Sequence, residues 1–129
     1  MHMGSLGGIA GSALNAFGVD MLVRANNIAN VNTNGFHSQD LSLMTGPGGE
    51  GTLVGNIYYN TSRGPLVPGL VMSDGGGREV LSPGYVEGSN TDVAHEFVHM
   101  IVNQRSYEAN AAVVRAYDQL SGTVLDMKI

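Results

Sequence analysis

The 129-residue chain contains no Cys and no Trp, and it has only five Tyr and three Phe. Without Cys it can form neither a disulfide nor a thiolate metal site. This composition fits either a cytoplasmic or an exported bacterial protein. Because large aromatic side chains are so few, the chain also has few bulky anchors for a hydrophobic core.

Positive charge is scarce as well. Six Lys and Arg residues stand against eleven Asp and Glu, which gives a net charge of −5, and the basic residues are scattered singly. Nucleic acids and anionic membranes bind clustered Lys and Arg, so we exclude both as the main partner. We also find no apolar run long enough to cross a bilayer and no basic start typical of a cleavable signal peptide, and we predict neither.

The strongest pattern in the chain predicts one long helix over Val93–Met127. Apolar residues recur there every three or four positions, and no Pro or Gly interrupts the run before Gly122. A second apolar stripe, which includes Val98, Ile101 and Val102, lies beside the first. A helix that is apolar over so much of its circumference is buried on several sides. It is either an ordinary core helix or a helix whose burial is completed by other copies of the chain.

A second helical pattern runs from about Leu6 to Ala29. Its interior glycines, such as Gly11 and Gly18, each cost a helix about 1 kcal/mol relative to Ala, so we expect this helix to be marginal in isolation. We predict that the apolar residues of the two helices pack on each other within or between subunits: Leu14, Phe17, Met21 and Ile28 against Val93, Phe97, Met100, Tyr107, Val114 and Leu125.

An asparagine-rich segment, residues 25–36, follows the first helix. Asn amides can satisfy the free backbone groups of a helix end, and Asn-Gly is a strong turn signal. We predict an ordered corner that reverses the chain, shaped by Asn27, Asn30, Asn32, Gly35 and Phe36.

The middle of the chain has a different composition. Residues 39–88 contain all four prolines and twelve of the nineteen glycines, together with short apolar runs but no helical period. We expect a small β insert or a partly disordered segment, with Gly55-Asn56 and Pro68-Gly69 as candidate turns and 45–51 and 73–78 as connectors. The predicted division is 1–39 for the first helix and corner, 40–88 for the Gly/Pro-rich insert, and 89–129 for the second helix.

One motif points to metal chemistry. His95-Glu96-Phe97-Val98-His99 matches the His-Glu-x-x-His helix of zinc proteases, in which two imidazoles share Zn²⁺ and the Glu activates water. However, no third ligand follows at a suitable spacing, and Phe97 belongs to the apolar face. A small zinc hydrolase using His95, Glu96 and His99 is therefore our alternative hypothesis, and the favoured interpretation has no cofactor.

The two ends of the chain resemble the axial proteins of the bacterial flagellum, the rod and hook family. The similarity lies in residues 25–36 at one end, and in Gly84–Ala94, Gln104–Asn110 and Asp118–Leu120 at the other. The resemblance implies a mainly α fold in which long N- and C-terminal helices pair as a coiled coil around a small β-rich or partly disordered middle. It also implies subunits that are exported through the flagellar type III apparatus without a cleaved signal peptide.

On this resemblance, the chain is expected to be a non-enzymatic structural subunit of the flagellar basal-body rod. It would assemble with copies of itself and with other rod and hook proteins into a hollow shaft that spans the periplasm, without nucleic acid or a small-molecule substrate. The short middle is most like that of proximal-rod proteins. A related possibility is a rod paralogue that binds an axial partner or an export factor without polymerising.

Overall fold

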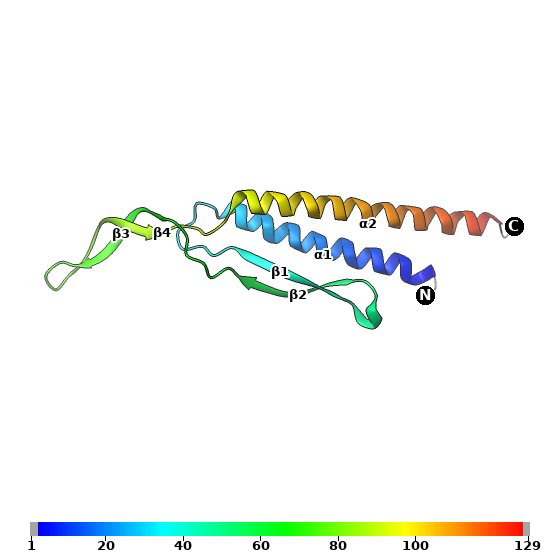
Figure 1. The fold of residues 1–129 in the computed structure, drawn as a ribbon, viewed down its shortest axis with the longest axis horizontal. Helices are drawn as coiled ribbons and strands as arrows, with labels where there is room; N and C mark the ends of the chain where they lie inside the picture. The colour runs from blue at the N-terminus through cyan, green and yellow to red at the C-terminus, as the bar shows by residue number, and fades with distance from the viewer. Residues whose placement is uncertain (1–2, 128–129) are drawn as a thin grey trace.

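The computed structural model describes residues 3–127. Helix α1 spans Met3–Ala29 and helix α2 spans Val93–Met127. The two helices lie side by side and run in opposite directions, and the end of α2 extends past the start of α1 (Figure 1). Asp92 caps α2, because its carboxylate accepts a hydrogen bond from the backbone N–H of His95 at 3.3 Å.

Residues between the helices form two separate hairpins. Strands β1, Gln39–Thr45, and β2, Thr52–Tyr59, pair antiparallel in one sheet, with the short 3₁₀ turn η1, Pro47–Gly49, between them. Strands β3, Leu66–Asp74, and β4, Glu79–Glu87, pair antiparallel in the other. The β1–β2 hairpin runs along α1, whereas β3–β4 projects beyond the end of the helix pair (Figure 1).

The prediction of a mainly α fold with coiled-coil helices is wrong. The structure is a mixed fold of two helices and two small antiparallel sheets. The middle forms paired strands, and exposed and half-buried residues alternate over residues 66–71 of β3. The candidate turns at Gly55-Asn56 and Pro68-Gly69 lie inside β2 and β3 instead. The reversals occur at the glycine-rich segments that were predicted as connectors, where Gly48, Gly49, Gly51, Gly76 and Gly77 have positive φ.

The contact between the helices also differs from a coiled-coil seam. The most buried positions of α1 include small alanines, Ala10, Ala13 and Ala16, and those of α2 are the polar residues Glu96 and Asn103. A coiled coil requires large apolar side chains at the corresponding positions. The most buried residues of the two helices are therefore small or polar instead of large and apolar.

Helix α1 also corrects the expectation that no segment could cross a membrane. Residues Leu6–Ala29 are long and apolar enough by length and composition, with a mean hydropathy of 1.4. The reason is that alanine and the aliphatic residues outweigh the two charges in this segment, Asp20 and Arg24. Both of those charged side chains are buried against other parts of the chain.

The surface of the molecule is large for its mass. A compact monomer of this size exposes about 6,500 Å², whereas this chain exposes 8688 Å². Among the described residues, the buried apolar side chains are those of Ala10, Ala13, Ala16, Val23 and Leu41. The excess of about 2,000 Å² is comparable to the area buried in a specific protein–protein interface.

Candidate assembly interface

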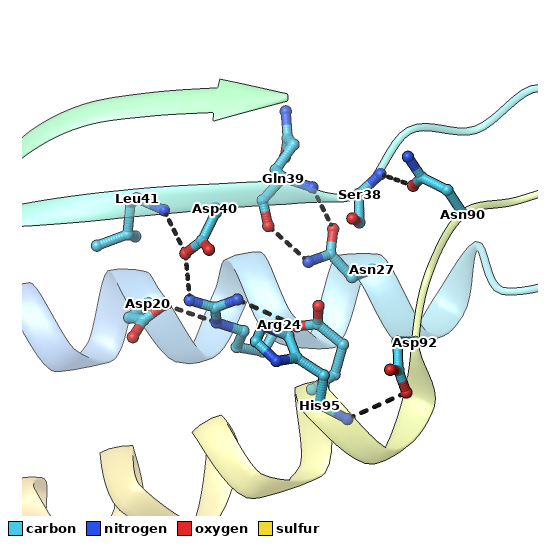
Figure 2. Close-up of polar contacts among 11 residues, drawn as sticks. Asp20, Arg24, Asn27, Ser38, Gln39, Asp40, Leu41, Asn90, Asp92 and His95 are labelled. Carbon is cyan, nitrogen blue, oxygen red and sulfur yellow. Dashed lines mark hydrogen bonds and ion pairs between the residues drawn. The ribbon is translucent and has the colours of Figure 1, made fainter. Parts of the chain in front are cut away.

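A largely buried charged cluster lies where α1, β1 and α2 meet. We call it the Arg24 cluster, and it consists of Asp20, Arg24, Asp40 and Glu96 (Figure 2). The Arg24 guanidinium donates to Asp20 Oδ1 at 3.0 Å, to Asp40 Oδ1 at 2.5 Å and to Glu96 Oε2 at 3.4 Å. Arg24 and Glu96 are each only 2% exposed. One side chain thus ties together three elements that are far apart in the sequence.

The electrostatics of the cluster favour its charged form. Burial alone would lower the pKa of Arg24, but the carboxylates of Asp20, Asp40 and Glu96 outweigh burial and raise the pKa of this guanidinium. Burial would likewise raise the pKa of Asp40, but the backbone N–H of Leu41 and the guanidinium of Arg24 outweigh it and lower that pKa. A buried network of this kind adds little net stability to the fold. Its main effect is to specify which charged groups come together when the chain folds.

A second polar joint connects the end of α1 to the start of β1. The Asn27 side chain is fully buried; its Nδ2 donates to Gln39 O at 2.7 Å, and its Oδ1 accepts from Gln39 N at 2.8 Å (Figure 2). The Asn27 amide thereby bonds both the N–H and the C=O of Gln39, as the backbone of a neighbouring strand would. This arrangement requires the fork of donor and acceptor that Asn provides.

Asn90 holds the other side of the corner. Its Oδ1 accepts from Ser38 N at 2.6 Å, and its Nδ2 donates to Asn60 O at 2.8 Å and to Ser62 O at 2.9 Å. The side chain thus connects the segment before α2 to β1 and to the segment after β2. Together, Asn27 and Asn90 fix how the hairpins leave the helix pair.

The residues predicted to shape the corner are distributed as follows. Asn30 closes the end of α1, since its Nδ2 donates to Asn26 O at 2.9 Å and its Oδ1 accepts from Thr33 Oγ1 at 3.0 Å. Gly35 has φ 74° and donates its N–H to Glu87 O at 2.9 Å. Asn32 is exposed and Phe36 is half-buried. Their role in shaping the corner stays a prediction.

The residues predicted to pack between helices fall into two groups. The half-buried group is Leu14, Phe17, Met21, Ile28, Val93, Met100 and Val114. The exposed group is Phe97 at 52%, Tyr107 at 42% and Leu125 at 67%. The half-buried group is partly covered by other parts of the same copy, whereas the exposed group remains accessible to another molecule.

The histidine pair does not form a metal centre with other side chains. The rings of His95 and His99 lie with their centroids 4.4 Å apart and tilted by 56°. Glu96, the general base of the zinc hypothesis, is occupied by Arg24. Within residues 3–127, no group of three or more His, Cys, Asp or Glu side chains is placed to hold a metal ion. The zinc hydrolase hypothesis therefore gains no support.

Sequence reasoning missed the Arg24 cluster, the buried Asn103 and the joint made by Asn90. One signal was available: Asp20 and Arg24 are four residues apart on an otherwise apolar helix, which is the spacing of an ion pair. Their partners Asp40 and Glu96 come from other elements, so no local pattern identifies them. The partners of Asn90 are likewise distant in the sequence, at Ser38, Asn60 and Ser62.

Family models match both helical ends of the chain. The model described as "Flagella basal body rod protein" matches residues 9–37, and "Flagellar basal body rod FlgEFG protein C-terminal" matches residues 82–127. The two matched segments contain Arg24 and Glu96, which join α1 to α2, and Asn27 and Asn90, which join the helical ends of the chain to the segments around β1 and β2. These matches define the class of the protein as a flagellar axial protein.

Individual relatives agree with this class. The chain is 33% identical over 90 residues to the flagellar basal-body rod protein FlgG of Borreliella burgdorferi, covering 69% of this chain and 33% of the relative. It is 30% identical over 133 aligned positions to the flagellar hook protein FlgE of Salmonella typhimurium, covering 81% of this chain and 32% of the relative. The chain spans about a third of the length of each of these relatives. It belongs to the rod and hook family of flagellar structural proteins.

Proposed function

We propose that the chain is a non-enzymatic structural subunit of the flagellar basal-body rod, which packs with copies of itself and with other rod and hook proteins into a periplasmic shaft. The observation that carries this proposal is the exposed apolar surface. The accessible area exceeds that of a compact monomer by about 2,000 Å², and large apolar side chains are exposed along α2 and both hairpins.

This surface would contribute substantially to association. Burial of apolar area stabilises by about 25 cal/mol per Å² before the costs of association are subtracted. A monomeric soluble protein rarely leaves contiguous apolar patches of this kind uncovered. The relatives named as rod and hook proteins support flagellar components as the partners.

Genetic deletion tests the proposal. We expect a strain that lacks the chain to be non-motile and to assemble basal bodies with no complete rod when these are imaged. Complementation with the wild-type gene should restore the rod, and Val102→Asp, which places a charge on the exposed face of α2, should not. A control variant, Arg115→Ala, elsewhere on α2, should complement fully.

The outcome also separates the alternatives. Complete rods in the deletion strain would contradict a structural role. Rods that form but stop short, with the purified chain staying monomeric, would favour a paralogue that binds an axial partner without polymerising. Export through the flagellar type III apparatus, and a position in the proximal rod, stay predictions from the resemblance.

A further inference from the structure

The β3–β4 hairpin presents one strongly apolar face. In an antiparallel pair, residues directly opposite each other lie on the same face of the sheet. The register Leu66↔Glu87, Pro68↔Tyr85, Leu70↔Pro83 and Met72↔Leu81 therefore gathers the large apolar side chains on one side. We call this side the hairpin face: Leu66, Pro68, Leu70, Met72, Leu81, Pro83 and Tyr85. Its Leu, Met and Tyr side chains are between 58% and 72% exposed.

The opposite side of the hairpin is different. It combines small residues with valines that cover its glycines: a Cβ added at Gly69 would meet Val86 Cγ2 at 2.7 Å, and one added at Gly84 would clash with Val71. The valines on this side are thus partly satisfied by the hairpin itself. The hairpin face has no such cover within the described chain.

The base of the hairpin is fixed, so the face cannot turn back onto its own helices. Glu87 O accepts from Gly35 N at 2.9 Å, Glu87 Oε1 accepts from Gly64 N at 3.0 Å, and Gly88 N donates to Pro65 O at 2.7 Å. The first bond ties β4 to the corner after α1, and the other two close the base of the hairpin between residues 64–65 and 87–88. From there the hairpin projects past the end of the helix pair (Figure 1).

A surface of matching chemistry lies on the outer side of α2. Val98, Ile101, Val102 and Arg105 follow the i, i+3, i+4, i+7 spacing of one helix face. The three apolar side chains are between 54% and 60% exposed. Arg105 forms none of the ion pairs found among the described residues. We call these four residues the α2 stripe.

Charge at the hairpin tip complements the end of this stripe. Asp74 and Glu79 are opposite each other in the register and lie at the end of the hairpin face. Like charges in directly opposite positions destabilise a strand pair. Asp74 accepts a hydrogen bond from Gly77 N at 2.9 Å, and Arg78 is adjacent in the turn. A second cation at this tip would offset the remaining negative charge.

We propose that the hairpin face docks on the α2 stripe of a second copy of this chain, with Arg105 of that copy meeting Asp74 and Glu79. This inference rests on the proposed function and specifies one contact of the assembly. The contact joins two different surfaces, so a bound pair still offers one free hairpin on one copy and one free stripe on the other. Such head-to-tail contacts produce rings or open helical assemblies.

The absence of native Cys allows a direct test by disulfide trapping. Met72→Cys in one copy and Val102→Cys in a size-tagged copy are mixed and oxidised. Ser73→Cys, the next residue on the opposite side of the hairpin, replaces Met72→Cys as the matched control. We expect at least ten-fold more mixed dimer with Met72→Cys than with Ser73→Cys. Equal yields, or no mixed dimer, would overturn the proposed contact.

Charge exchange provides an independent measurement. By sedimentation, Arg105→Glu should weaken self-association about ten-fold, and the double variant Arg105→Glu with Glu79→Arg should recover most of it. Arg115→Glu, on the same helix outside the stripe, should change association less than two-fold. Circular dichroism confirms that each variant is folded. Failure of the double variant to recover would overturn the assigned ion pair.

The results distinguish this contact from the proposed function. If the wild-type chain associates and Arg105→Glu associates equally well, the contact is wrong and a rod subunit remains supported. If the wild-type chain stays monomeric at every concentration and gives no trapped dimer, both the contact and self-assembly are contradicted.

Discussion

Two regions of the molecule are built on opposite principles. The junction of α1, β1 and α2 buries Arg24, Asn27 and Glu96 almost completely and satisfies them with partners from distant elements. The far part of α2 and the β3–β4 hairpin instead expose large apolar side chains, including Leu70, Tyr85, Leu120 and Leu125. Polar matching thus fixes the shape of one copy, and apolar surface is left for contacts between copies.

Among the changes that test this contrast, removal of Arg24 should lower the free energy of unfolding the most. We expect Arg24→Ala to lower the free energy of unfolding by about 3–5 kcal/mol, because three carboxylates lose their common cation inside the protein. Urea unfolding followed by circular dichroism measures the change. Arg105→Ala, which removes an exposed arginine, should stay within about 0.5 kcal/mol of wild type. Similar losses in the two variants would show that the junction does not stabilise the fold.

Asn27→Ala tests the second joint of the junction. It leaves the backbone N–H and C=O of Gln39 without their side-chain partner, at a cost of about 1–3 kcal/mol. Asn56→Ala, which removes an exposed side chain of β2, serves as the control and should be within about 0.5 kcal/mol of wild type. The comparison is made from thermal unfolding midpoints. A result in which both substitutions are neutral would remove Asn27 from the set of residues that fix the corner.

Two glycine substitutions, one in the corner and one on α1, should change the free energy of unfolding in opposite directions. Gly35→Ala places a side chain at φ 74°, which costs about 1–2 kcal/mol. Gly18→Ala adds a methyl group in open space on α1, where it should gain about 0.5–1 kcal/mol by favouring the helix. Both changes are read from urea midpoints. Destabilisation by Gly18→Ala in assembled rods, together with stabilisation of the free chain, would indicate that a neighbouring copy packs closely against this glycine.

Acid should weaken the junction by the smallest amount. The pKa of Asp40 in the folded chain lies below its ordinary value of 3.8, so its stabilising contribution is complete above that value and is lost as the pH falls through the lower folded pKa. The effect is modest because the Asp40 side chain is one-third exposed. We expect the unfolding free energy of Asp40→Asn to fall less steeply below pH 4 than that of wild type. Parallel pH profiles would contradict this role of Asp40.

The repeating patterns of the sequence predicted the two helices but not the polar junction between them. The apolar period over 93–127 predicted α2, Val93–Met127, whereas the turns of both hairpins lie in glycine-rich segments that were predicted only as connectors. The period did not show which face of α2 meets α1, because the outer side carries equally apolar residues such as Val98 and Ile101. Burial on α2 is instead greatest at Glu96, whose partner Arg24 lies on α1, and at Asn103, whose Nδ2 has no hydrogen-bond partner among the described residues. Long-range polar pairing of this kind has no periodic signature in one sequence.

The coiled-coil prediction failed for the same reason. It assumed that the most apolar positions, such as Phe97 and Tyr107, face the other helix. The structure instead buries alanines of α1 and polar residues of α2 and leaves Phe97 and Tyr107 accessible. The residues of α2 whose apolar pattern predicted a core are largely exposed in the single copy.

Amide hydrogen exchange on the free and assembled chain tests the contrast between the two regions most directly. We predict that residues 20–41 and 88–103 are protected in both states, whereas residues 66–87 and 104–127 become protected only on assembly. Equal and strong protection of all four segments in the free chain, unchanged on assembly, would contradict the claim that these apolar surfaces are completed by neighbouring subunits.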